Sequence, residues 1–278
     1  MRHDTVILPV PGVSEPTKLL TFIPDNFPEM GMDKRRPAII VCPGGGYLFR
    51  SDREAEPVAL RFMGLGCATF ILEYHYAPIG HYPTPQRQVL TAIDHVRSHC
   101  DEYHVNPNAI LVMGFSAGGH LAGSAATMWK YPEVLEGLTK EPRAYRPDGV
   151  ILAYPVITSG PKAHRDSFVN LLHDRYEELL DVTSLEKIVD EDTAPAFLWH
   201  TADDELVPVE NTLMMAEAMK AKGVSVEHHI YPHGSHGQSL ADETVYSKEG
   251  MRNMSAGCAI WVEHCMQWIR RNYMPRNI

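Results

Sequence analysis

The sequence lacks several features that would identify a membrane or secreted protein. It contains no apolar run long enough to cross a bilayer, and its N-terminal segment has neither the apolar core nor the small-residue cleavage site of a signal peptide. Cysteine is scarce, with 5 scattered residues among 278. An odd, scattered set argues against a disulfide framework and favours reduced thiols in the core. From these absences we expect a cytoplasmic protein.

Positive charge is also in short supply. The chain has 25 Lys and Arg residues against 35 Asp and Glu residues, which gives a formal net charge of -10. Nucleic acids and anionic membrane surfaces are bound by clustered Lys and Arg, so we expect neither as a partner. The sequence shows no repeat, low-complexity tract or linker. We therefore predict a single domain over residues 1–278, large enough to bury a substantial core.

Apolar runs along the chain predict strands that alternate with helices. This alternation is typical of an α/β protein with a mostly parallel sheet, right-handed crossovers and helices on both faces. The first two strands, separated by a Pro/Gly/Ser turn, are predicted to form an antiparallel edge hairpin. The predicted strands are 6–8, 18–23, 37–42, 67–74, 110–113, 149–155, 195–200 and 225–231. The main predicted helices are 51–63, 85–103, one after residue 116, 209–222 and one around 260–269, with a turn at 104–108.

The charged segment 158–192 interrupts this alternation. It contains histidine and two helical pieces, predicted at 168–180 and 184–189. One interpretation is a small cap over the carboxyl end of the sheet, and the other is a surface excursion with no role in a site. Both have the same composition, so the sequence favours neither.

The segment Gly114-Phe-Ser116-Ala-Gly118 joins a predicted strand directly to a helix of small residues. Such a corner forces its central residue into a strained backbone geometry, and glycine on either side removes the Cβ atoms that would clash. The Ser116 hydroxyl is then exposed at the carboxyl end of the sheet, near a helix N-terminus that favours negative charge. Ser116 is therefore the candidate nucleophile.

Three consecutive glycines, Gly44, Gly45 and Gly46, follow the predicted strand 37–42. Without side chains, their backbone N–H groups can point into a cavity. The position after a core strand and before a helix is where an α/β-hydrolase has its oxyanion loop. A flexible loop is the alternative interpretation.

A serine nucleophile needs an imidazole base and an acid that orients it, and in this fold the chain order is Ser, acid, His. Asp204 follows a late strand, lies four residues after His200 and four before Pro208, and is preferred to its neighbour Asp203. Glu205 is the third adjacent carboxylate. The candidate histidines after the last strand are His233 and His236. His236 is preferred because it lies between Ser235 and Gly237, where the loop is freest to turn back.

A metal site built from His233, His236, Asp203 and Asp204 is the competing interpretation. No His-Glu-x-x-His helix is present and no cysteine lies nearby in the sequence. A metal would also leave Ser116 and the three glycines unexplained. We therefore expect no metal and no cofactor.

Five segments resemble the α/β-hydrolase carbohydrate esterases related to bifunctional acetylxylan/feruloyl esterases. The block Met113-Gly-Phe-Ser-Ala-Gly-Gly-His-Leu-Ala122 is far more specific than the bare Gly-x-Ser-x-Gly pattern. Pro43 departs from the related lipases and esterases, which have histidine before the glycines, so the sequence does not show what braces this loop. The matching segments are 42–47, 72–78, 113–122, 199–211 and 231–237, in the family's order.

The resemblance implies an α/β-hydrolase fold with Ser116, His236 and Asp204 as the catalytic triad. It also implies that the backbone N–H groups of Gly45, Gly46 and Ala117 form the oxyanion hole. The implied substrate is a small acyl ester, most of all acetyl, of a sugar such as a xylo-oligosaccharide; a feruloyl group would need a roomier pocket. A serine peptidase and a non-catalytic binding protein on the same scaffold remain as alternatives, and a homo-oligomer is possible.

Overall fold

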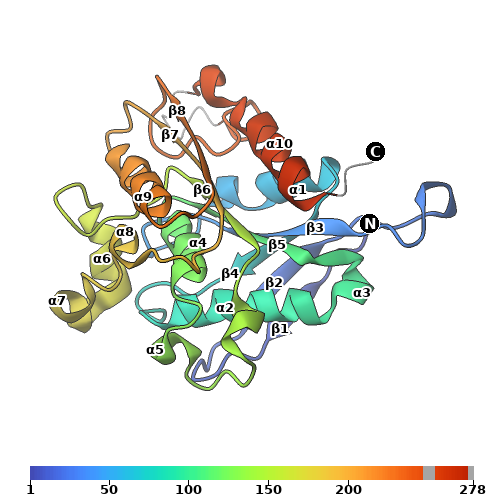
Figure 1. Ribbon diagram of the computed structural model, residues 1–278, viewed down its shortest axis with the longest axis horizontal. Coiled ribbons are helices and arrows are strands. Elements are labelled where there is room, and N and C mark those ends of the chain that lie inside the picture. The colour runs from blue at the N-terminus through green and yellow to red at the C-terminus, as the bar shows by residue number, and fades with distance from the viewer. Residues whose placement is uncertain (247–253, 275–278) are drawn as a thin grey trace.

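A computed structural model describes residues 1–246 and 254–274. Its centre is an eight-stranded sheet in the order β1-β2-β4-β3-β5-β6-β7-β8 (Figure 1). β1 and β2 are antiparallel and form one edge, whereas β3 to β8 are parallel. The predicted edge hairpin and parallel sheet are therefore both present. The strands are β1 Thr5–Leu8, β2 Thr17–Phe22, β3 Arg36–Cys42, β4 Ala68–Glu73, β5 Val105–Phe115, β6 Gly149–Ala153, β7 Ala196–Thr201 and β8 Val226–Tyr231.

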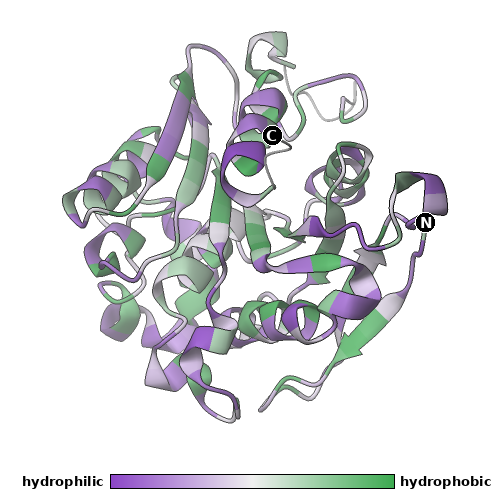
Figure 2. Ribbon diagram, turned by 45° about the vertical axis from the view of Figure 1, so that its right-hand side comes forward, coloured by the Kyte–Doolittle hydropathy of each residue, from purple (hydrophilic) through white to green (hydrophobic). Residues whose placement is uncertain are grey.

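Helices cover both faces of the sheet (Figures 1 and 2). α1 and α10 pack on one face with Phe62 and Trp261, and α2, α4 and α9 pack on the other with Val89, Leu121 and Met215. The α-helices are α1 Glu56–Gly64, α2 Thr84–Ser98, α3 Cys100–Tyr103, α4 Ala117–Thr127, α5 Pro132–Leu135, α6 Arg165–Leu172, α7 Tyr176–Leu179, α8 Leu185–Ile188, α9 Glu210–Ala221 and α10 Trp261–Tyr273. Short 3-10 turns lie at Pro28–Met30, Asp52–Glu54, Pro142–Tyr145, His173–Arg175 and Ala256–Cys258.

The buried central strands explain why these sequences are continuous apolar runs. Successive residues of β3 face opposite sides, so Ala38 and Ile40 join one core and Ile39 and Val41 join the other. Figure 2 shows the hydrophobic strands between the two helix layers. All five cysteines are free and buried, as the sequence predicts.

Several predicted elements differ from the structure; the predicted helix 85–103, for example, is divided into α2 and α3. The predicted helix 51–63 is a 3-10 turn, Asp52–Glu54, followed by α1, which begins only at Glu56. Pro57 favours a helix start because its missing N–H is one of the groups that a first turn leaves unpaired. The predicted turn 104–108 lies mostly inside β5, because Val105 pairs with Arg36 before the register shifts to Ala38 and Ile110.

The segment 158–192, called the cap below, contacts the loop after β3. The predicted helix 168–180 is divided into α6, a 3-10 turn and α7, while α8 corresponds to the predicted helical piece 184–189. The side-chain amide of Asn170 donates to the Gly46 carbonyl at 2.8 Å, and Tyr82 N–H donates to the Leu171 carbonyl at 2.8 Å. These contacts favour the cap interpretation over a remote surface excursion.

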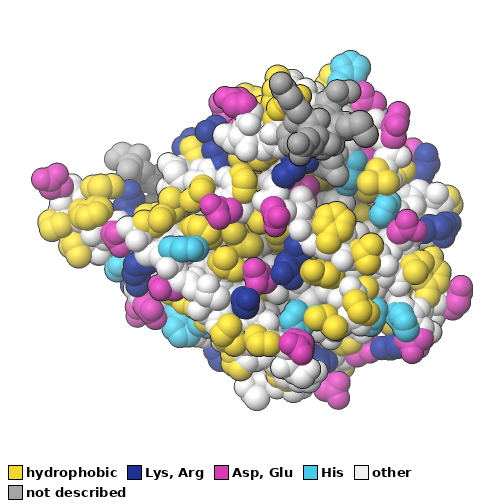
Figure 3. Space-filling view, turned by 180° about the vertical axis from the view of Figure 1, so that it is seen from behind, with side chains coloured by type: hydrophobic (Ala, Val, Ile, Leu, Met, Phe, Trp, Pro, Cys, Tyr) yellow, Lys and Arg dark blue, Asp and Glu magenta, His cyan; other side chains and the backbone are white. Residues whose placement is uncertain are grey.

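The loop between β2 and β3 projects from the body, at the right of Figure 1 and the left of Figure 3. It carries three exposed apolar side chains, Phe27, Met30 and Met32. On the face shown in Figure 3, Lys and Arg side chains are interspersed with Asp and Glu. Among the described helices, none combines the length and the apolar character that crossing a membrane requires.

Candidate active site

Ser116 lies at a sharp corner between β5 and α4, with φ 54° and ψ −120°. A Cβ at Gly114 would overlap the Gly118 carbonyl oxygen, and one at Gly118 would overlap the Cys42 carbonyl oxygen. Only glycine therefore allows β5, α4 and the end of β3 to approach this closely. The predicted strand–turn–helix is present, and the corner holds Ser116 at the carboxyl end of the sheet.

His236 connects Ser116 to Asp204. Its Nε2 lies 2.8 Å from Ser116 Oγ and its Nδ1 lies 2.7 Å from Asp204 Oδ2. Because the carboxylate can only accept, Nδ1 carries the proton and Nε2 is left to accept from the serine hydroxyl. The three residues follow β5, β7 and β8, and parallel strands bring their carboxyl ends to one edge. The structure thus brings all three predicted residues together.

Asp204 is enclosed by hydrogen-bond donors. Its Oδ1 accepts from the N–H groups of Leu206 at 3.0 Å and Val207 at 2.9 Å, and its Oδ2 lies 3.3 Å from His200 Nε2. Burial raises the pKa of the Asp204 carboxyl, but the bonds from His200 and His236, the positive charge of His236 and the Val207 N–H together lower that pKa below its usual value. Asp204 is therefore held as a carboxylate.

The competing pair, Asp203 and His233, lies apart from Ser116. Asp203 Oδ2 is 3.1 Å from His233 Nδ1, and Oδ1 accepts from Gly234 N–H at 2.6 Å. Both side chains are exposed, 52% for Asp203 and 82% for His233. The bond from Gly234 and that from His233 lower the pKa of Asp203. This pair fastens the loop that carries His236 to the loop after β7.

The glycine loop lies directly against the serine corner. Gly45 and Gly46 have φ values of 134° and 63°, a region that favours glycine. Within the described part of the chain, the N–H groups of Gly45, Gly46 and Ala117 make no hydrogen bond. A Cβ at Gly44 would lie only 3.0 Å from Ser116 Cβ. Gly45 and Gly46 directly follow Gly44, and Ala117 directly follows Ser116, so all three N–H groups are available for an acceptor beside the serine corner.

The sequence did not identify Glu54, which braces this loop. Its buried carboxylate accepts from Gly44 N–H at 2.8 Å through Oε2 and from the Tyr154 hydroxyl at 2.7 Å through Oε1. The Tyr74 hydroxyl also donates to the Pro43 carbonyl at 2.6 Å. These bonds replace the bracing for which the sequence, with proline at position 43, gave no candidate. An acidic residue in a polar segment has no sequence signal that separates it from a surface charge.

Two further histidines lie near the glycine loop. His120 is buried; its Nε2 donates to the Thr183 carbonyl at 2.8 Å and its Nδ1 lies 2.9 Å from the Tyr47 hydroxyl. Burial lowers the pKa of His120 to about 4. It is thus neutral and links α4 to the cap.

His164 extends from the cap toward Gly46. Its Cε1 lies 4.0 Å from the position of a Cβ at Gly46, and its Nδ1 lies 2.9 Å from Ser167 Oγ. Burial and the charge of His236 lower the pKa of His164, so its imidazole is neutral at pH 7. Among the described residues, none forms a hydrogen bond with its Nε2.

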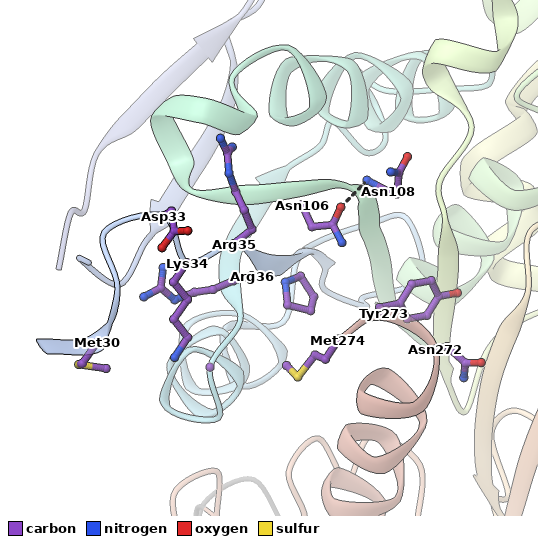
Figure 4. Close-up of a pocket in the computed structure, with 12 residues that line it drawn as sticks. Met30, Asp33, Lys34, Arg35, Arg36, Asn106, Asn108, Asn272, Tyr273 and Met274 are labelled. Atoms are coloured by element: carbon purple, nitrogen blue, oxygen red, sulfur yellow. Dashed lines mark hydrogen bonds between the residues drawn. The ribbon is translucent and has the colours of Figure 1, made fainter. Parts of the chain in front are cut away.

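Groups of three or more metal-ligating side chains in metal-binding geometry do not occur among the described residues. A cavity of about 970 Å³ lies elsewhere, lined by Arg36 at the start of β3, Asn106 and Asn108 in β5 and Tyr273 at the end of α10 (Figure 4). It adjoins the amino ends of β3 and β5, whereas Ser116 lies past the carboxyl end of β5. It is therefore separate from the Ser116 site.

The sheet order, the serine corner and the order Ser, Asp, His along the chain define an α/β-hydrolase. The structure is similar throughout to the carboxylesterase Cest-2923 from Lactobacillus plantarum WCFS1, with a TM-score of 0.84, 26% identity and full coverage of both chains. The BD-FAE family model matches residues 26–219, and the chain belongs to that family. The matched range contains Ser116 and Asp204 and ends before His236.

Two curated relatives have names that refer to xylan. The chain is 35% identical over 232 residues to endo-1,4-beta-xylanase B of Butyrivibrio fibrisolvens, covering 81% of this chain and 36% of that protein. It is 32% identical to an acetylxylan esterase of Xylanibacter ruminicola, covering 79% of this chain and 43% of that one. The chain thus corresponds to less than half of each of these two proteins.

A relative of matching length is a structurally determined acetyl ester-xyloside bifunctional hydrolase from Caldicellulosiruptor lactoaceticus. It shares 35% identity and a TM-score of 0.83, and the match covers 98% of this chain and 97% of that one. The fold and the family predicted from the sequence are confirmed, and the chain stands among ester hydrolases.

Proposed function

We propose that this protein is a serine esterase that removes small acyl groups, acetyl above all, from sugars such as xylo-oligosaccharides, without a metal or cofactor. The observation that carries the proposal is His236, which bridges Ser116 Oγ at 2.8 Å and Asp204 Oδ2 at 2.7 Å. A nucleophile, a base and an orienting carboxylate in hydrogen-bond contact are what acyl transfer requires.

In the first step, Ser116 Oγ attacks the ester carbonyl carbon and His236 Nε2 takes the hydroxyl proton. The carbonyl oxygen becomes an oxyanion, which the N–H groups of Gly45, Gly46 and Ala117 stabilise; one such donor contributes about 3 kcal/mol. The tetrahedral intermediate collapses as its bond to the alcohol oxygen breaks. His236 gives its proton to that oxygen, so the sugar leaves as an alcohol and the acyl group stays on Ser116.

In the second step, water attacks the acyl-enzyme. His236 removes a proton from the water, the same N–H groups hold the second oxyanion, and the bond to Ser116 Oγ breaks. The serine recovers its proton from His236 and the carboxylic acid leaves. Throughout, the Asp204 carboxylate fixes the Nδ1–H tautomer and stabilises the imidazolium.

Two lines of support favour a sugar ester. One is the acetylxylan and xyloside activity named for the relatives. The other is the cap, which brings the neutral imidazole of His164 next to Gly46. No described residue forms a hydrogen bond with its Nε2. A sugar hydroxyl on the alcohol side of the ester can donate to that nitrogen.

The proposal is tested by hydrolysis of 4-nitrophenyl esters from acetate to octanoate, followed by acetate release from acetylated xylo-oligosaccharides. We expect the wild type to prefer acetate and to release acetate from the sugar, and Ser116→Ala to lose both activities. Retained activity in well-folded Ser116→Ala would refute the nucleophile. Inactivity of the wild type on every ester would favour the peptidase or the binding protein.

A further inference from the structure

Glu54 occupies an unusual place for an acidic residue. Its side chain is 3% exposed, and no described Lys or Arg forms an ion pair with it. A buried charge without an ion partner is costly and must be held by hydrogen bonds. Both carboxylate oxygens have such a bond, from the Gly44 N–H and from the Tyr154 hydroxyl.

Gly44 lies between this carboxylate and the nucleophile. A Cβ at Gly44 would lie 2.7 Å from Glu54 Oε2 and 3.0 Å from Ser116 Cβ. The bond to Gly44 therefore fixes the first residue of the glycine loop against the serine corner. Gly45 and Gly46, whose N–H groups would form the oxyanion hole, follow directly.

The second oxygen of Glu54, Oε1, is connected through Tyr154 to the loop that carries His236. Tyr154 donates to Glu54 and accepts from Ser239 N–H at 2.9 Å, three residues after His236. Burial and the charge of Glu54 raise the pKa of Tyr154 well above its usual value, so the hydroxyl keeps its proton and donates. The Tyr154 ring also packs edge-on against the His236 ring, with centroids 5.1 Å apart.

The 3-10 turn that carries Glu54 is also bonded directly to the loop that carries His236. Arg53 donates to the Gly237 carbonyl at 3.2 Å and to the Val245 carbonyl at 2.7 Å. Ser239 Oγ in turn donates to the Arg53 carbonyl at 2.6 Å. One short turn, Asp52–Glu54, is therefore bonded both to the glycine loop and to the loop that carries the base.

We propose that Glu54 is a positioning residue. It holds the glycine loop and the loop that carries His236 at the correct distance from Ser116. This inference rests on the proposed function. In Gln an NH2 donor replaces one of the two carboxylate oxygens, so either the Gly44 N–H or the Tyr154 hydroxyl loses the acceptor that Glu54 provides. Loss of either bond frees one loop relative to the other.

The test is the rate at which an alkyl fluorophosphonate labels Ser116, because this reaction needs no correct choice of ester. The serine oxygen bonds to phosphorus, fluoride leaves, the serine proton passes to His236, and the phosphoryl oxygen occupies the oxyanion hole. We expect Glu54→Gln to label at least tenfold more slowly than the wild type. The matched control is Glu56→Gln, an exposed neighbour, which should label at the wild-type rate.

Steady-state kinetics on 4-nitrophenyl acetate distinguish positioning from a general loss of structure. Glu54→Gln should lower kcat about tenfold or more, leave KM within about twofold, and keep a cooperative thermal transition. Glu54→Asp, which keeps the charge but is one methylene shorter, should recover part of kcat. If Glu54→Gln does not fold, Tyr154→Phe replaces it: this variant keeps the ring against His236 and should label several-fold more slowly.

Wild-type labelling and wild-type kcat in folded Glu54→Gln, or in Tyr154→Phe, would overturn the inference. A wild-type protein that labels at Ser116 but hydrolyses no ester would instead contradict the proposed function. In that case the comparison of labelling rates still decides the role of Glu54.

Discussion

Two Asp–His pairs join the loop after β7 to the loop after β8. They have the same residue types but differ in exposure and in their further contacts. Asp204 and His236 are nearly inaccessible, with side-chain exposures of 0% and 10%, whereas Asp203 and His233 are 52% and 82% exposed. His236 reaches Ser116, and Asp204 is further bonded by Leu206, Val207 and His200. Water and salt screen an exposed pair, whereas the enclosed pair is shielded from them and its geometry is fixed by further hydrogen bonds. Burial with full hydrogen bonding thus separates a site from a surface contact.

The largest effect is expected from removing each histidine in turn. His236→Ala removes the base and should lower kcat/KM on 4-nitrophenyl acetate by about 10⁶-fold. His233→Ala should change kcat/KM by no more than a few-fold, because its partner is exposed. Steady-state kinetics check both variants, and equal losses in the two would mean that the choice between these histidines is wrong.

The aspartates should differ next. Asp204→Asn keeps the shape but can stabilise the wrong His236 tautomer, and we expect kcat to fall about 10⁴-fold. Asp203→Asn should change the free energy of unfolding only slightly, as for exposed ion pairs, with little change in kcat. Steady-state kinetics give kcat for both variants, and urea unfolding gives their free energies of unfolding. A larger loss of kcat in Asp203→Asn than in Asp204→Asn would reverse the assignment.

His120, which is fully buried, extends the comparison to pH dependence. Burial lowers the pKa of His120 to about 4, against about 6.5 when unfolded. Between these values the unfolded chain binds the proton and the folded one does not, so stability falls as the pH falls. The loss between pH 7 and pH 4 is about 3 kcal/mol from this residue. The lowered pKa of Asp204 acts only below about pH 4, where the unfolded carboxyl takes up its proton.

The measurement is urea unfolding of the wild type and His120→Gln at pH 7 and pH 4.5. The variant loses the titrating group but keeps a donor for the Thr183 carbonyl, so its stability should depend less steeply on pH. An unchanged pH dependence in His120→Gln would place the titration elsewhere.

The smallest expected effect concerns the cap. His164→Ala should raise KM for acetylated xylo-oligosaccharides about tenfold, as for one lost hydrogen bond, and leave KM for 4-nitrophenyl acetate within about twofold. His173→Ala, an exposed histidine on the same cap, is the matched control. If His164→Ala affects both esters equally, the imidazole does not contact the sugar.

The parts of the molecule that follow from local pattern could be predicted from the sequence. Glycines around Ser116 are dictated by contacts within one corner, and the register from His200 to Pro208 distinguished Asp204 from Asp203. Chain order and the shared edge of parallel strands then brought His236 into reach.

The rest depends on contacts between distant segments. Glu54 meets Tyr154, 100 positions away, and no periodicity marks that pair. The cap could not be distinguished from an excursion because its composition fits both, and contacts such as the bond from Asn170 to Gly46 are visible only in the folded structure. The prediction of a helix over 51–63 is wrong at the 3-10 turn that carries Arg53 and Glu54. This turn is bonded to the glycine loop and to the loop that carries His236.

The central claim is that Ser116 is the nucleophile activated by His236, and the most direct test is to locate a covalent adduct. The protein is treated with an alkyl fluorophosphonate, digested and mapped by mass spectrometry. The account predicts one adduct, on the peptide containing Ser116, absent in Ser116→Ala and strongly slowed in His236→Ala but not in His233→Ala. An adduct on another residue, or none on the folded wild type, would contradict it.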